Sequence, residues 1–166
     1  MKTGLVGLHL HARQSTINGP FTFDSRGLFA RPLLYGLVMF ARTLGPDARL
    51  VTLQRHIPHS VPLKAWAVEV SGNELRVLLI NKGPRSVTVS LKLPASAPAK
   101  LQRLLAPSVS ARSGETIAGQ SLDENVTWRG RYQVQFVSPG TGGYSVTTAP
   151  YSAVLLSVPL TPGALQ

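Results

Sequence analysis

From about residue 48 onward, the chain is a succession of short strand-like segments bounded by turn residues, and this pattern limits its fold more than any other feature. In Ser86–Leu93, for example, valine or leucine alternates with serine, threonine or lysine, a period of two that is typical of a strand with one solvent-facing side. No helix-like stretch separates the segments, so they predict a mainly β fold, an antiparallel β-sandwich. The segments expected to be strands are Arg49–Gln54, Leu63–Val70, Glu74–Asn81, Ser86–Leu93, Lys100–Leu105, Thr116–Ala118, Tyr132–Val137, Tyr144–Thr148 and Ala153–Val158.

The first 45 residues follow a different pattern, in which a strand, a long loop and a helix come in turn. Residues 4–11 predict a buried strand, residues 12–30 a loop, and residues 31–43 a helix with Pro32 in its first turn. One side of this helix carries an apolar stripe made of Leu33, Leu34, Leu37, Val38, Phe40 and Ala41.

A single strand–helix unit cannot bury both faces of its strand, so residues 1–45 are expected to be the edge of a larger structure. The chain therefore divides into this edge, a β-sandwich over residues 46–160 and a tail over residues 161–166. The apolar stripe of the helix would otherwise face water, and it predicts a partner surface.

Charge and composition exclude several classes of function. Lys and Arg number 17 against 7 Asp and Glu, a formal charge of +10, which favours polyanionic partners. The basic residues never form a run of three, so we expect no nucleic-acid partner. No apolar run reaches the roughly 18 residues of a membrane-spanning helix, so we expect no membrane partner. No cysteine is present for disulfides or thiolate chemistry.

The start of the chain lacks the pattern of a secretory signal, because its apolar run is short and basic residues follow at once. Location stays open: cytoplasmic if Met1 is the true start, secreted or periplasmic if a longer precursor exists.

The chain offers little for catalysis, metal binding or cofactor binding. A glycosidase needs two carboxyl groups facing each other across the sugar bond, and no two of the seven acidic residues are placed in this way, so we expect no catalytic residue. His56 and His59 are separated by Pro58, and no cysteine or nearby carboxylate completes a zinc site, so no metal is expected. Gly140–Gly143 lacks the Lys-Ser/Thr pair of a phosphate loop, and no cofactor is expected.

Three basic or titratable residues near the start are the candidates for substrate binding. His9 and His11 are two apart on the predicted strand, so both side chains project from the same face. In a β/α barrel, polar residues at the carboxyl end of a strand line the active-site mouth, and His9, His11 and Arg13 would contact substrate there. The alternative is a pair of histidines that form only local hydrogen bonds.

The aromatic residues permit two interpretations. Exposed aromatic rings pack against sugar rings, so they would form a platform for carbohydrate. At 7% aromatic content, core or inter-sheet positions are the simpler interpretation. The residues concerned are Trp66, Trp128, Tyr132, Tyr144 and Tyr151.

Four stretches, in the same order and at similar spacing, resemble glycoside hydrolase family 79, the heparanase and β-glucuronidase family. They are ARPLLYGLVMFA (30–41), LRVLLINKG (75–83), LQRLLAPSVSARSGETIAGQSLD (101–123) and PYSAVLLSVP (150–159). The resemblance covers nearly the whole chain. It implies that residues 1–45 are the last β/α unit of a (β/α)8 catalytic barrel, and that residues 46–160 are the C-terminal β-sandwich domain.

The same resemblance implies where the catalytic groups would lie. The family's two catalytic glutamates are on earlier barrel strands, which this chain does not contain. A tyrosine in the loop after the eighth strand contacts the uronate carboxylate in the family, but the corresponding ARQSTINGPFTF (12–23) has no tyrosine. Arg13 or His11 would then offer positive charge to that carboxylate.

We therefore expect the accessory β-sandwich region of a family 79-like glycoside hydrolase, catalytically incomplete on its own. The full-length enzyme would hydrolyse uronic-acid-containing glycans or glucuronides. The expected partners are that carbohydrate, through the full-length enzyme, and the rest of the barrel or a second copy of the chain at the helix stripe. The alternative function is a free-standing carbohydrate-binding β-sandwich for acidic polysaccharides.

Overall fold

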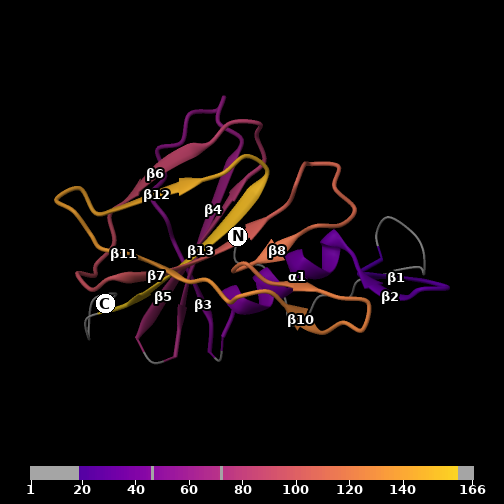
Figure 1. Ribbon diagram of the computed structural model, residues 1–166. Coiled ribbons are helices and arrows are strands. Elements are labelled where there is room, and N and C mark those ends of the chain that lie inside the picture. Colours follow the sequence, from indigo (N-terminus) through magenta and orange to yellow (C-terminus); the bar gives the residue numbers. More distant parts are fainter. Residues whose placement is uncertain (1–18, 46, 72, 161–166) are drawn as a thin grey trace.

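The computed structural model describes residues 19–45, 47–71 and 73–160 of the chain (Figure 1). The predicted strand over residues 4–11 lies outside this range. The helix is α1 (Pro32–Thr43), and the strands are β1 (Phe21–Asp24), β2 (Gly27–Ala30), β3 (Arg49–Val51), β4 (Leu63–Val70), β5 (Glu74–Asn81), β6 (Val87–Leu91), β7 (Ala99–Leu105), β8 (Thr116–Ile117), β9 (Ser121–Leu122), β10 (Trp128–Arg129), β11 (Gln135–Val137), β12 (Tyr144–Thr148) and β13 (Ser152–Pro159). The described part is mainly β with antiparallel strand pairs, as the sequence predicted.

One large sheet organises the molecule. Its strands follow the order β11-β7-β13-β5-β4-β3, and β8 adds to β7. β13 lies in the middle of this sheet, paired with β5 on one side and β7 on the other. A smaller sheet of β6 and β12 forms a second layer.

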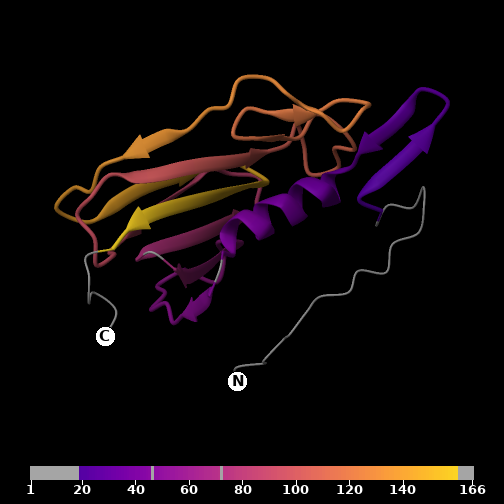
Figure 2. The same cartoon turned by 90° about the horizontal axis from the view of Figure 1, so that it is seen from below.

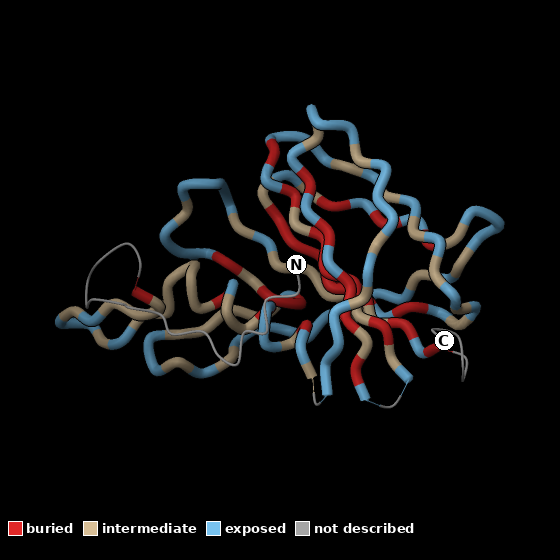
Figure 3. The backbone as a smooth tube through the Cα atoms, turned by 180° about the vertical axis from the view of Figure 1, so that it is seen from behind, coloured by how far each residue is buried: buried red, intermediate tan, exposed pale blue. Residues whose placement is uncertain are grey.

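The two faces of the large sheet are covered by different elements. On one face, Val77, Leu101 and Leu156 pack against Tyr144 and Val146 of the smaller sheet. On the other face, Leu78, Ala153 and Leu155 pack against α1. Figure 2 shows α1 lying obliquely across that second face, and Figure 3 shows the buried residues gathered along the central strands. The result is a β-sandwich with a helix on its outer side.

α1 reaches the sheet through residues spaced one turn apart. Tyr35, Met39 and Thr43 are buried, at the i, i+4, i+8 spacing of one helix face. The Tyr35 hydroxyl accepts the backbone N–H of Leu122 at 2.8 Å, and its ring meets Trp128 edge to face. Pro32 stands in the first turn, as predicted. α1 is the only helix among the described residues, and it does not have the length to span a bilayer.

The predicted loop over residues 12–30 was wrong for its second half. Residues 21–30 form the β1–β2 hairpin, in which Asp24 faces Gly27 across the turn. The Asp24 Oδ1 accepts the backbone N–H of Arg26 at 2.8 Å, and Gly27 has φ +139°, a conformation that glycine adopts without strain. The hairpin projects beyond the N-terminal end of α1 and has no buried residue (Figure 2).

Other segments also differ from expectation. The short pair β9–β10 was missed, because two-residue strands have too little alternation to be recognised. Some strands are shorter than predicted, with β3 ending at Val51 and β11 beginning at Gln135. The tight connection over residues 82–85 joins the two sheets, because β5 pairs with β13 whereas β6 pairs with β12.

A buried side-chain amide secures this sheet-to-sheet connection. Asn81 is 1% exposed, and its Nδ2 donates to the carbonyl oxygens of Arg85 (2.7 Å) and Ala149 (2.8 Å). Its Oδ1 accepts the backbone N–H of Gly83 at 3.0 Å. One residue thus joins the chain leaving β5 to the chain entering β13, and all of its hydrogen-bonding groups are used.

Asn81→Asp is expected to lower the free energy of unfolding by about 3 kcal/mol, because a carboxylate oxygen would replace the buried amide nitrogen that donates to two backbone carbonyls. Urea unfolding followed by circular dichroism measures the change. Asn125→Asp makes the same substitution at an exposed residue and should stay within about 0.5 kcal/mol of the unsubstituted chain. Equal losses in the two variants would contradict this role for Asn81.

Candidate functional site

The three predicted substrate-binding residues, His9, His11 and Arg13, lie outside the described residues, so their role stays a prediction. The described residues contain no group of three or more His, Asp or Glu side chains placed to hold a metal ion. Two surfaces remain as candidates: the outer face of α1, and a polar pocket at the C-terminal end of the same helix.

All seven acidic residues are described, and three of them form ion pairs with arginine. Asp24 pairs with Arg26 in the hairpin turn, and Glu74 pairs with Arg76 on β5. A fourth carboxyl, that of Glu115, is buried with no hydrogen-bond partner for its Oε1 among the described residues. The ion pairs of Asp24 and Glu74 link neighbouring residues of a turn and of a strand, which is a structural use of charge.

Asp123 forms the third of these ion pairs, with Arg129, and it organises the loop between β9 and β10. Its Oδ1 accepts the backbone N–H groups of Thr127 (2.9 Å) and Asn125 (3.0 Å), and its Oδ2 accepts Nε of Arg129 at 2.7 Å. The hydrogen bond from Thr127, followed by that from Arg129, holds the pKa of Asp123 below its usual value. The ionised carboxylate is therefore part of the folded loop.

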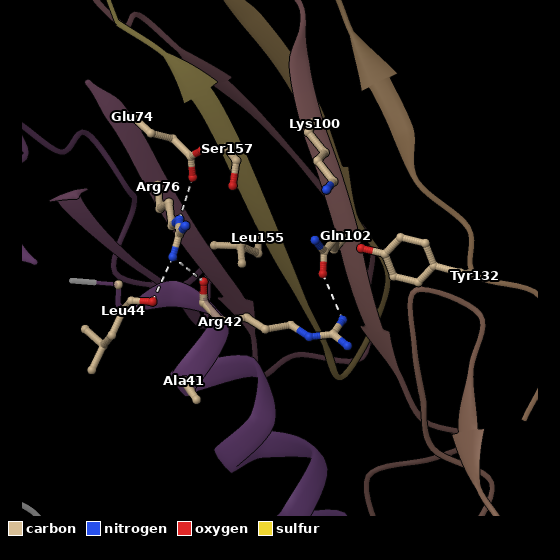
Figure 4. Close-up of a pocket in the computed structure, with 11 residues that line it drawn as sticks. Ala41, Arg42, Leu44, Glu74, Arg76, Lys100, Gln102, Tyr132, Leu155 and Ser157 are labelled. Carbon is tan, nitrogen blue, oxygen red and sulfur yellow. Dashed lines mark hydrogen bonds and ion pairs between the residues drawn. The ribbon is translucent and has the colours of Figure 1, made fainter. Parts of the chain in front are cut away.

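The polar pocket opens where α1 ends over the large sheet (Figure 4). Arg76 reaches up from β5 and donates from Nη1 to the carbonyl oxygens of Arg42 (2.9 Å) and Leu44 (2.7 Å). These carbonyls belong to the last turn of the helix, where no backbone donor is left for them and where positive charge is favourable. Arg76 therefore fixes the end of α1 to the sheet.

A second arginine extends along the other side of the pocket. Arg42 donates from Nη1 to Oε1 of Gln102 at 2.9 Å, and its guanidinium carbon lies 5.8 Å from the centre of the Trp128 ring. Sequence reasoning singled out Trp128 but missed Arg42 and Gln102, because these two come from separate segments and form no local motif. The only available signal was the overall excess of basic residues.

The outer face of α1 is apolar as well. Leu33, Leu37, Phe40 and Leu44 follow one another at i, i+4, i+7 and i+11, on a side of the helix turned away from Met39, and Phe40 is the one of the four nearest to it. Phe40 is 47% exposed and Leu44 38% exposed. We call these four residues the outer face. Together with the inward residues they leave α1 with apolar side chains on two opposite sides.

The aromatic residues do not form a single platform. Tyr144 is fully buried, and its hydroxyl donates to the carbonyl oxygen of Ala97 at 2.6 Å. Trp128 packs on Tyr35, whereas Trp66 and Tyr132 are both more than 40% exposed. Core and surface roles are therefore divided among these residues.

Comparison with known proteins shows which protein family has this β domain. The profile of the glycosyl hydrolase family 79 C-terminal beta domain matches residues 65–155, more than half of the chain. The chain belongs to this family. The match runs from β4 to β13 and so takes in both sheets of the sandwich and their connections. No curated protein is similar enough in sequence to match the chain.

Solved structures share the fold of this family 79 β domain. A 4-O-α-L-rhamnosyl-β-D-glucuronidase from Fusarium oxysporum 12S has a TM-score of 0.69 and 18% identity, covering 84% of this chain and 31% of its own. GH30 xylanase C from Talaromyces cellulolyticus has a TM-score of 0.59 and 18% identity over 89% and 29% of the two chains. The GH51 arabinofuranosidase from Xanthomonas axonopodis pv. citri has a TM-score of 0.58 and 15% identity, covering 88% of this chain and 30% of its own. The chain thus spans about a third of the length of each, and the likeness is one of fold.

The Asp123 interactions predict a specific pH dependence. Because the folded-state pKa lies below the unfolded value near 3.8, the carboxylate stabilises the fold above that pH, and the stabilisation is lost as pH falls through the folded pKa. Asp123→Asn should therefore be less stable than the unsubstituted chain at neutral pH, and the difference between their free energies of unfolding should shrink as the pH falls. Urea unfolding at a series of pH values measures this difference.

Glu124→Gln is the matched control, because it removes the adjacent, exposed carboxylate, which forms no ion pair with a described residue. It should change stability at neutral pH less than Asp123→Asn does. If the difference in free energy of unfolding between Asp123→Asn and the unsubstituted chain stays constant from neutral pH into acid, the Asp123 charge does not stabilise the loop.

Proposed function

We propose that this β domain is the accessory part of a family 79-like glycoside hydrolase, and that the rest of the catalytic barrel packs against α1. Residues 1–45 would be the last β/α unit of that barrel, and residues 46–160 the domain that supports it. The barrel would hydrolyse uronic-acid-containing glycans or glucuronides. The chain described here would not cleave a glycosidic bond by itself.

The observation that carries this proposal is that α1 is apolar on two opposite sides. A helix at the surface of a protein has one apolar and one polar side, whereas a helix that is apolar all round is buried between two bodies. The inward residues Tyr35 and Met39 are already covered by the sheet and its loops. The outer face, on which Phe40 and Leu44 are exposed, is the side that a barrel would cover.

The uronate substrate is supported by two independent considerations. The solved structure with the TM-score of 0.69 is described as acting on a β-D-glucuronide, although at 18% identity. The basic chain, at +10, also suits an acidic substrate. In this proposal His9, His11 and Arg13 contact the substrate from the end of the barrel strand.

The proposed lack of activity follows from the acidic residues. Asp24, Glu74 and Asp123 are each bound to an arginine. Hydrogen bonds hold the pKa of Asp24 and of Asp123 below the usual value, which opposes service of either as a general acid. The two glutamates of such a hydrolase would come from the other barrel strands.

Phe40→Lys tests the outer face. If a barrel is the natural cover, this substitution should change the free energy of unfolding by no more than about 0.5 kcal/mol, because Phe40 adds little to the domain's own core. It should also weaken the self-association that an uncovered apolar face promotes, seen as a lower average mass by sedimentation equilibrium and less binding of a hydrophobic dye.

Two further variants serve as controls for Phe40→Lys, one at a buried residue and one at an exposed residue. Met39→Lys places the same charge on the neighbouring, 2% exposed residue and should cost about 3 kcal/mol or more. Leu50→Lys alters an apolar residue that is 69% exposed on β3, at the edge of the large sheet, and should leave the mass unchanged. If Phe40→Lys unfolds the chain as Met39→Lys does, the outer face belongs to the domain's own core and the proposed barrel contact is wrong.

Hydrolysis of 4-nitrophenyl β-glucuronide by the purified chain tests the absence of a complete catalytic site. We expect no release of nitrophenol above the rate without protein. Turnover that disappears in Asp24→Ala would overturn this part of the proposal, because it would place a catalytic carboxylate within the chain.

A further inference from the structure

The pocket at the end of α1 has the composition of a binding site for an acidic sugar. Its volume is about 600 Å³, within the range of small-ligand pockets. Its walls come from α1, β5, β7 and β13 and from Tyr132, and the nearly buried Leu155 lies between these walls (Figure 4). The pocket adjoins the outer face of α1 at Leu44, and its cations and Tyr132 lie outside that face.

Positive charge dominates the pocket. Arg42, Arg76 and Lys100 line it together with a single carboxylate, that of Glu74. Arg76 is engaged by Glu74 and by the end of α1. Lys100 is exposed, and no described residue forms a hydrogen bond or ion pair with its Nζ. Arg42 uses one nitrogen on Gln102 and presents further N–H groups.

The strand register adds an aromatic side chain beside Lys100. Phe136 of β11 pairs directly with Lys100 of β7, so the two side chains project from the same face of the sheet. Phe136 is 72% exposed, and Tyr132, on the pocket wall, is 46% exposed. Ser157 follows as the next partner of Lys100 across the sheet and places a hydroxyl in the pocket.

We propose that this pocket binds a hexuronate residue of an acidic glycan, with Lys100 and Arg42 holding the carboxylate and Tyr132 and Phe136 packing against the sugar ring. Cationic side chains form strong, charge-assisted hydrogen bonds to carboxylates, and aromatic faces pack well on the C–H surface of a sugar. Gln102 and Ser157 are available to ring hydroxyl groups. A nucleic acid is the less favoured polyanion, because the cations gather in one hollow and do not form a stripe that follows a backbone.

The site needs no catalytic barrel, so its test is independent of the proposed function. β-1,4-linked tetraglucuronate is titrated into the full chain by calorimetry, with cellotetraose as the matched neutral sugar of the same linkage. We expect binding of tetraglucuronate that weakens as salt is added, and no measurable binding of cellotetraose. Equal affinity for the two sugars would overturn the proposal.

Substitutions then locate the site. Lys100→Gln should weaken binding of tetraglucuronate by about five- to tenfold, and Lys100→Arg should retain most of it. Tyr132→Ala should weaken it by a similar, roughly fivefold factor through loss of ring packing. Lys92→Gln removes an exposed lysine next to β6, in the other layer of the sandwich, and should leave the affinity unchanged.

The outcomes against the proposal are distinct. If Lys92→Gln and Lys100→Gln weaken binding equally, the attraction is a property of the whole basic chain and not of this pocket. If polyuridylate binds more tightly than tetraglucuronate and Lys100→Gln weakens that binding, the pocket serves a phosphate backbone. Because Lys100 is exposed, an unchanged melting temperature should accompany its substitution, which separates loss of binding from loss of fold.

Discussion

Burial of the central strands on both faces is the constraint on which the rest of this structure depends. In β5 and β13, leucine, isoleucine and valine occupy successive positions, so both sides of each strand must be removed from water. The sheet of β6 and β12 covers one side, and α1 covers the other. The helix is therefore an integral layer of the β domain, even though it precedes the sandwich in sequence and the family profile begins only at residue 65.

Because α1 serves as a cover, its own composition becomes informative. One side of the helix is enough to bury Leu78 and Leu155, and Tyr35, Met39 and Thr43 provide it. On the outer face, Leu33 and Leu37 are half-buried, whereas Phe40 and Leu44 remain exposed among the described residues. A helix placed between a sheet and a second body would explain both sides at once, and this is the physical basis for the proposal that a barrel packs there.

Strand locations could be read from the sequence because local alternation and apolar runs record them; β4 and β5 appear as predicted. The pairing partner of each strand could not be predicted, because pairing depends on contacts between distant segments. The turn at residues 82–85, for example, connects strands of two different sheets and not two paired strands. The hairpin over residues 21–30 was missed although Asp24 and Gly27 mark its turn, since Asn18-Gly19-Pro20 favoured a loop. The pocket was missed for the same reason as the pairing: Arg42, Arg76 and Lys100 are brought together only by the fold.

The pocket exists because α1 is too short to cover the whole face of the large sheet. Twelve residues make a helix of about 18 Å, and the large sheet continues beyond its end. Arg76 satisfies the last helical carbonyls at that point, and beyond it the row of Arg76, Ser157, Lys100 and Phe136 runs across the sheet without a helix above it. An uncovered sheet face of a domain that needs no ligand would carry unrelated polar side chains. Here it carries cations next to exposed aromatic rings, the combination on which the proposed binding of an acidic sugar rests.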